Sequence, residues 1–180
     1  MPIGKSASQP IDRSPDGLQG ALLRGASRRD SDRQPISELG YRFSAWNNAA
    51  MEADEASLSL ACGSWSMTQG ITNFVILRLP ESSTYETLDG ILPLVRDTAE
   101  CWEPEWATVF GRDAPTEAQP VLDWVFLRRP SLPNANALPE GVRVMDWGPV
   151  GQCLVTQKEP VDWHERGQVD RLQAIRTALR

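Results

Sequence analysis

The chain has 180 residues, of which 41% are hydrophobic and 23% are charged, and its formal net charge at pH 7 is −6. A chain of this length normally forms one domain and buries roughly 70% of its unfolded surface, so it needs no metal or disulfide to fold. The negative charge argues against direct nucleic-acid binding, which needs Lys and Arg to neutralise phosphates. There is no apolar signal segment and no run of 18 apolar residues, so we expect a cytoplasmic protein without membrane contact.

Few residues of the chain are candidates for catalysis or metal binding. Cys62, Cys101 and Cys153 lie far apart and have no zinc-ligand or redox spacing, so we interpret them as buried small hydrophobes in a reducing compartment. His164 lacks the second histidine of a zinc-protease helix. A pairing of His164 with one of the cysteines stays open, but the cysteines occupy positions that suit inert packing. We therefore predict no catalytic residue, no metal and no cofactor, and we do not expect an enzyme.

Residues 1–35 differ from the rest in composition. They contain no aromatic residue and carry a net charge of +2, whereas the remainder of the chain carries −8. A short helix is possible at residues 18–23. We expect a mobile or loosely docked N-terminal arm here, with residues 36–180 forming the folded domain. An arm that folds back onto the acidic body is the alternative.

Three strands are predicted in the first half. Residues 41–46 and 57–62 alternate between apolar and polar side chains, which is typical of half-buried strands. Residues 71–79 are apolar on both faces apart from Asn73 and Arg78. That pattern predicts a strand that is buried on both sides and lies centrally in its sheet.

The clearest helix pattern covers residues 84–101, where apolar side chains recur at i, i+3 and i+4. The stripe consists of Tyr85, Leu88, Leu92, Val95, Ala99 and Trp102. Gly90 and Pro93 are expected to kink or split this helix, because proline removes a backbone donor. Pro104 ends it.

Further strands are predicted at residues 106–110, 121–127, 142–147 and 152–156, and residues 148–151 form the turn of a hairpin between the last two. A final helix is predicted at residues 166–179, with an apolar stripe of Val169, Leu172, Ile175 and Leu179. This order of elements predicts an α+β fold. We expect a single domain with a largely antiparallel mixed sheet, a kinked central helix and a C-terminal helix packed on one face.

The chain has seven tryptophans against two tyrosines and four phenylalanines, so tryptophan is expected to fill much of the core. Those assigned to the core are Trp102, Trp106, Trp124 and Trp147. In the Asp123-Trp124 dipeptide, neighbouring strand residues face opposite ways, so Asp123 should point to solvent or across the sheet. Trp163 precedes the last helix in a loop. If it is exposed there, it is a candidate binding anchor.

Charge is concentrated in residues 81–123, which hold ten Asp/Glu and only Arg96 and Arg112, a net charge of −8. Six of these carboxylates form the predicted acidic surface: Glu86, Asp89, Asp97, Glu100, Glu103 and Glu105. Such a surface can steer a basic partner, and the alternative is an ordinary solvated helix face. Glu103 and Glu105 flank Pro104 on one local turn, which does not suit the paired carboxylates of a glycosidase.

Three motifs of the sequence form a recognisable set: Cys62-Gly63, the Asn73-to-Pro80 segment and the step WEPEWA at residues 102–107. Together they resemble the immunity protein 52 family of bacterial polymorphic-toxin and type VI secretion loci. Two pieces depart from the family pattern: Asp123-Trp124 stands where Gly-Trp is usual, and residues 151–154 read GQCL where Gly-Thr-Leu is usual. The resemblance covers about residues 40–180 and leaves the arm out.

The resemblance implies a cytoplasmic protein that binds a cognate secreted toxin and neutralises it by occluding its active site. It also implies that the toxin is often a nuclease, and a nuclease would be basic. Two other classes stay open: an adaptor or chaperone that loads a type VI effector, using Trp163 and the arm, and an uncharacterised enzyme. The sequence does not indicate the oligomeric state.

Overall fold

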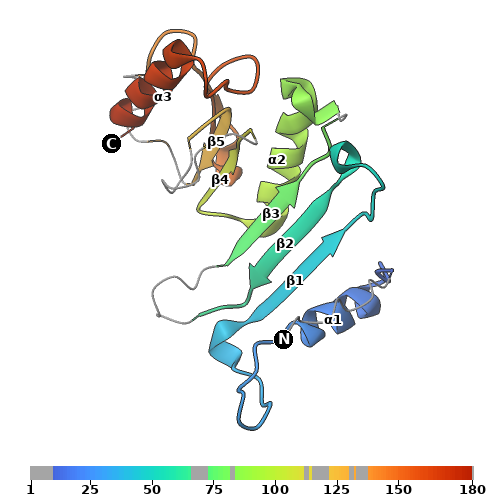
Figure 1. Cartoon of the computed structure of the whole chain (residues 1–180). Helices are drawn as coiled ribbons and strands as arrows, with labels where there is room; N and C mark the ends of the chain where they lie inside the picture. Colours follow the sequence, from blue (N-terminus) through green and yellow to red (C-terminus); the bar gives the residue numbers. More distant parts are fainter. Residues whose placement is uncertain are drawn as a thin grey trace. The chain divides into compact units, whose positions relative to one another are not determined.

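The computed structural model describes residues 10–65, 73–81, 84–111, 114, 122–129, 132 and 138–179. The chain divides into two compact units, Met1–Ser82 and Ser83–Arg180, which are described one at a time (Figure 1). Some predicted features lie outside the described residues: positions 1–9 of the arm, the first two residues of the strand at 71–79, residue 121, and the carboxylates of Asp113 and Glu117.

The first unit is a three-stranded antiparallel sheet with one helix. Strands β1 (Tyr41–Trp46), β2 (Ser57–Cys62) and β3 (Phe74–Arg78) lie in the order β1-β2-β3. Figure 1 shows helix α1 (Pro15–Arg24) alongside β1. The side chain of Ser14 caps α1 by accepting a hydrogen bond from the N–H of Gly17 at 3.1 Å. The helix suggested at residues 18–23 is confirmed and is longer at both ends.

The described part of the arm contacts β1 through its backbone. Ala26 forms an antiparallel bridge with Tyr41, and the carbonyl of Gly25 accepts a hydrogen bond from the N–H of Arg42 at 2.9 Å. Short 3₁₀ turns at Ser37–Leu39 and Glu52–Asp54 complete the unit. Residues 25 and 26 thereby tie the segment that follows α1 to the edge of the sheet.

The prediction that β3 is buried and central is wrong. β2 is the middle strand, whereas β3 pairs with β2 alone among the residues described. Ile76 in β3 is 55% exposed, and Leu77 is exposed as well. Apolar residues on both faces show what a strand can bury, but they do not show how many neighbours it pairs with. The sequence pattern therefore could not distinguish an edge strand from a central one.

The second unit contains a four-stranded antiparallel sheet and two helices. A 3₁₀ turn (Thr84–Glu86) leads into α2 (Leu88–Trp102). The strands are β4 (Trp106–Val109), β5 (Val125–Arg128), β6 (Arg143–Asp146) and β7 (Gln152–Val155), in the order β4-β5-β7-β6. Helix α3 (Arg166–Ala178) follows. The α+β class, the antiparallel pairing and the β6–β7 hairpin are confirmed, and the strands are divided between two sheets.

Strand register places α3 on one face of the four-stranded sheet. Phe126, Leu154 and Val144 lie opposite one another across β5, β7 and β6, so they share a face. They belong to one apolar cluster with Leu172 and Ile175 of α3. Leu172, Ile175 and Leu179 of the predicted stripe are thus confirmed as part of this cluster, whereas Val169 is half-buried and does not belong to it.

The other face carries Leu127, Cys153 and Met145, which are also aligned across the strands. Met145 and α2 line a common pocket, so α2 lies on this side. The two helices therefore lie on opposite faces of the sheet. α2 runs without interruption through Pro93, so Gly90 and Pro93 do not split it. Its fully buried residues are Ala99, which belongs to the predicted stripe, and Ile91, which does not.

Tryptophan fills less of the core than expected. Trp124 is buried at 3% exposure, as predicted, whereas Trp102 and Trp147 are only half-buried. Trp106 is 37% exposed, so its assignment to the core is wrong. It lies on β4, an edge strand, and its partner across the sheet is the exposed Arg128. An edge position leaves one side of the indole without a strand to cover it.

Asp123 was expected to point to solvent or across the sheet, and the solvent alternative is wrong because the residue is fully buried. Its Oδ2 accepts hydrogen bonds from Trp163 Nε1 at 2.9 Å and from the N–H of Gly111 at 3.2 Å. Among the residues that the structure describes, its Oδ1 has no hydrogen-bond partner. Burial raises the pKa of Asp123 above its ordinary value of 3.8, although the hydrogen bonds from Trp163 and Gly111 oppose this.

The raised pKa of Asp123 predicts an unusual pH dependence. Between 3.8 and the raised folded-state pKa, the folded protein holds this proton more tightly than the unfolded chain does, so Asp123 contributes more stability as the pH falls. Chemical denaturation should show wild type gaining unfolding free energy relative to Asp123→Asn as the pH is lowered from neutral towards 3.8. A gap that stays constant, or that moves the other way, would contradict the burial of a carboxyl group here.

The cysteines differ in exposure more than expected. Cys153 is buried, Cys62 is half-buried and Cys101 is exposed, so the view of all three as buried hydrophobes is wrong for Cys101. Burial raises the pKa of the Cys153 thiol to about 12, with the charge of Arg143 acting in the opposite direction.

Thiol alkylation tests this difference. The thiolate is the reactive form, so at mildly alkaline pH the native Cys153 should react on the order of 1,000-fold more slowly than Cys101. Peptide mass spectrometry would follow each cysteine, and denaturant should abolish the difference. Equal native rates would mean that Cys153 is open to solvent.

Candidate functional site

An amphipathic sequence and a side-chain N-cap explain why α2 forms and which of its faces is buried. The side-chain oxygen of Thr87 accepts a hydrogen bond from the N–H of Gly90 at 3.3 Å and donates one to the carbonyl of Thr84 at 3.0 Å. Ile91 and Ala99 then turn inward. Because helical side chains at i, i+4, i+7 and i+11 share a face, Asp89, Pro93, Arg96 and Glu100 come together on another face.

All six carboxylates of the acidic surface are exposed: Glu86, Asp89, Asp97, Glu100, Glu103 and Glu105. They run from the 3₁₀ turn before α2, along the helix, to the turn after it. Asp123 does not join them, because it is buried. The predicted surface is therefore present in the structure, with its members supplied by one helix and the two turns that flank it.

The fold adds positive charge to this surface that sequence order did not reveal. Arg129, at the end of β5, lies 3.4 Å from Glu103 between Nη1 and Oε2, and its N–H donates to the carbonyl of Glu105. Arg96 Nε donates to Glu100 Oε1 at 2.9 Å. Among the residues that the structure describes, Asp89 and Asp97 form no ion pair. Exposed pairs of this kind are worth about 0–1 kcal/mol, so they hold Glu100 and Glu103 only weakly.

The C-terminal end of α2 is electrostatically unfavourable. Its last turn contains no basic residue and includes Glu100, and Glu103 caps the helix, although the helix dipole favours cations there. Glu103 also has φ +48°, a left-handed conformation that favours glycine, and it precedes Pro104. Stability alone would select a different residue at this position. Glu103 therefore places a carboxylate where neither the backbone conformation nor the helix dipole favours one.

The strain at Glu103 makes a prediction about stability. Glu103→Gly should raise the unfolding free energy by about 1 kcal/mol, because glycine adopts positive φ without steric cost. The matched control is Glu105→Gly, since Glu105 is not among the residues with positive φ. Denaturant titration should show this control to be neutral or destabilised. If Glu103→Gly loses as much stability as Glu105→Gly, the left-handed cap is not strained.

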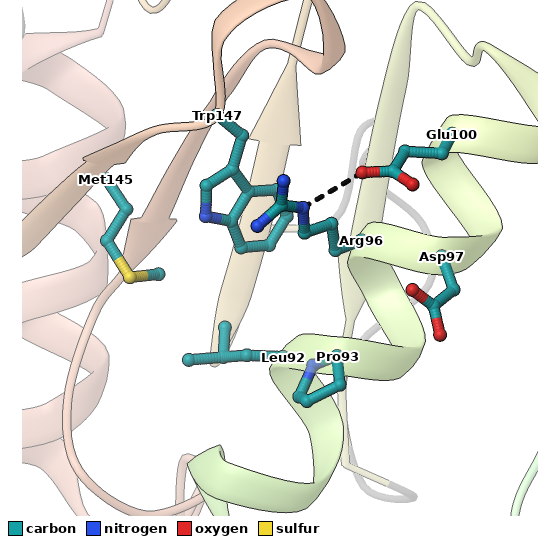
Figure 2. A pocket seen from close by; sticks show the side chains of 7 residues that line it. All are labelled: Leu92, Pro93, Arg96, Asp97, Glu100, Met145 and Trp147. Carbon is teal, nitrogen blue, oxygen red and sulfur yellow. Dashed lines mark hydrogen bonds and ion pairs between the residues drawn. The ribbon is translucent and has the colours of Figure 1, made fainter.

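A pocket of about 500 Å³ lies between α2 and the β6–β7 hairpin; we call it the α2–hairpin pocket. Its lining residues are Leu92, Pro93, Arg96, Asp97, Glu100, Met145 and Trp147. Figure 2 shows Arg96 and Trp147 projecting into it from opposite walls, with Arg96 hydrogen-bonded to Glu100. Asp97 also lines the pocket and comes from α2, like Arg96 and Glu100. Two members of the acidic surface therefore border an apolar and aromatic hollow that the sequence did not predict.

Trp163 does not belong to this site. It is half-buried, packs against the core cluster and donates its indole N–H to Asp123. The exposure that would make it a binding anchor is therefore not observed, because a buried carboxylate holds the ring in place. Residues 161–165 form a loop, but sequence reasoning had no means of identifying the partner of the indole.

The described residues contain no group of three His, Cys, Asp or Glu side chains that could hold a metal ion. His164 is exposed, and its backbone N–H donates to Asp162 Oδ1 at 2.9 Å. Within the part of the chain that the structure covers, no helix is long and apolar enough to cross a membrane.

No protein-family model matches the chain, and no curated protein matches it. The likeness to the immunity protein 52 family is therefore a prediction from the motifs of the sequence, and function has to be argued from the surface itself.

Proposed function

We propose that the protein is a cytoplasmic immunity protein that binds a basic antibacterial toxin, a nuclease, and neutralises it by covering its active site. The observation that carries this proposal is the row of six exposed carboxylates along α2 and its flanking turns. The motifs that resemble the immunity protein 52 family support the same function.

Charge complementarity supports a nuclease as the partner. A nuclease binds phosphates through a groove lined with Lys and Arg, so carboxylates spaced along a rigid helix can occupy the positions of phosphates. Oppositely charged surfaces also speed association well above the rate of neutral pairs. A stable inhibitory interface of this kind buries about 1,600 Å² in total, which requires residues beyond the acidic surface.

The weak internal ion pairs fit such a role. Arg96 and Arg129 hold Glu100 and Glu103 in exposed pairs, so a partner's cations can replace them at little cost. Asp89 and Asp97 have no ion pair to break within the described chain. The surface is thus ready for binding without a large rearrangement.

A genetic experiment tests the proposed function. A toxin encoded beside this gene should kill cells that lack the protein and spare cells that produce it. Protection should require direct binding, measured with the purified pair. A toxin that is harmless without the protein, or that needs it for secretion, would instead indicate an effector-loading adaptor.

A kinetic experiment tests the surface. The double variant Asp89→Lys/Asp97→Lys should lower the association rate constant at low salt by about tenfold or more, and raising the salt should slow wild type towards the variant. Glu103→Lys/Glu105→Lys should act in the same direction.

The matched control is Glu140→Lys/Glu159→Lys, which makes the same change in net charge at exposed positions away from the acidic surface. This control should slow association only slightly. If all three double variants behave alike, net charge accounts for the effect and the acidic surface is not the binding site.

A further inference from the structure

The α2–hairpin pocket combines three kinds of wall. Leu92, Pro93 and Met145 supply aliphatic and thioether surface, Trp147 supplies an indole, and Glu100 supplies a carboxylate beside them. A lysine or arginine side chain has the matching parts, because a long apolar stem carries its charged head. Its stem suits the aliphatic wall, and its head suits an indole face and a carboxylate.

The chain already places such a group in the pocket. Arg96 projects from α2 towards Trp147 and hydrogen-bonds to Glu100 (Figure 2). The side chains of Arg96 and Glu100 are 54% and 48% exposed, so their ion pair is of the weak surface kind. Arg96 therefore shows that a guanidinium can sit at this position, and it can leave at little cost.

We propose that the α2–hairpin pocket receives one lysine or arginine side chain of the basic partner, which takes the place of Arg96 on Glu100. Asp97, which also lines the pocket and has no ion pair in the described chain, attracts the incoming charge. This inference rests on the proposed function for the identity of the partner, but the pocket chemistry can be tested without any toxin.

The direct probe is a blocked peptide, acetyl-Gly-Arg-Gly-amide. Titration is followed by ¹⁵N NMR of the indole N–H of Trp147, which is assigned with Trp147→Phe. The peptide should shift this signal with a dissociation constant on the order of 1 mM, as expected for one anchoring side chain. The citrulline and norleucine peptides are the matched neutral controls and should bind at least about fivefold more weakly.

Variants of the pocket should act in opposite directions. Arg96→Gln removes the competing cation and should tighten binding of the arginine peptide several-fold, whereas Glu100→Gln should weaken it by a similar factor. Trp147→Leu should weaken it about two- to fivefold. Glu140→Gln, an equal charge change at an exposed position away from both the acidic surface and the pocket lining, should alter binding less than twofold. A gain of binding in Arg96→Gln cannot arise from damage to the fold, and the NMR spectra themselves report folding.

Four results would overturn the inference. The first two are an unshifted Trp147 signal at a peptide concentration twenty times the expected dissociation constant, and binding of the norleucine or citrulline peptide as tight as that of the arginine peptide. The other two are preferential binding of acetyl-Gly-Glu-Gly-amide, and weaker binding of the arginine peptide by Arg96→Gln. Preferential binding of the acidic peptide would mean that Arg96 itself is the binding group and that the ligand is an anion.

The cognate toxin separates this inference from the proposed function. If the toxin binds wild type and Trp147→Leu equally well, the pocket assignment is wrong and the immunity function stands. If no toxin binds but the arginine peptide does, the immunity function is wrong and the cation pocket is supported.

Discussion

The inward stripe of α2, formed by Ile91 and Ala99, fixes which face of the helix is exposed. Ile91 and Ala99 are fully buried, and burying an isoleucine side chain is worth about 1.5–3 kcal/mol, more than any exposed ion pair on the helix. Because a helix is rigid, turning this stripe inward leaves Asp89, Arg96 and Glu100 on an outer face. The same packing sets Leu92 opposite Met145 and Trp147 and so creates the α2–hairpin pocket. Hydrophobic packing thus determines where the charges lie.

Stability and charge conflict at the end of this helix. Glu103 combines a left-handed backbone with a carboxylate at the negative end of the helix dipole. Arg129 relieves the second problem in part and leaves the first unchanged. A site under selection for folding alone would carry glycine or asparagine there. Conflicts of this sort are expected where a surface is kept for binding, and they fall at the carboxylates that the proposed function needs.

Regular elements could be predicted from the sequence because periodicity reports them directly. The spacing of Leu172 and Ile175 predicted the buried face of α3, and the glycines at 148 and 151 predicted the hairpin turn. Pairing partners could not be predicted in this way. β3 has a core-like composition but lies at an edge, and Trp106 is exposed for the same reason.

The exposed carboxylates of α2 were predictable from their positions on the helix, whereas Arg129 and Trp147 reach the site through tertiary contacts that no local pattern encodes. The burial of Asp123 could not be predicted for the same reason, because its indole partner Trp163 lies forty residues away in the sequence.

The central claim is that the acidic surface on α2 meets the toxin, and hydrogen–deuterium exchange with and without the cognate toxin tests it most directly. The account predicts slower exchange on binding in α2, in the turn that contains Glu103 and Glu105, and in the hairpin turn after Trp147, with α3 unchanged. Protection confined to α3 or to the first unit, with α2 exchanging as in the free protein, would contradict it.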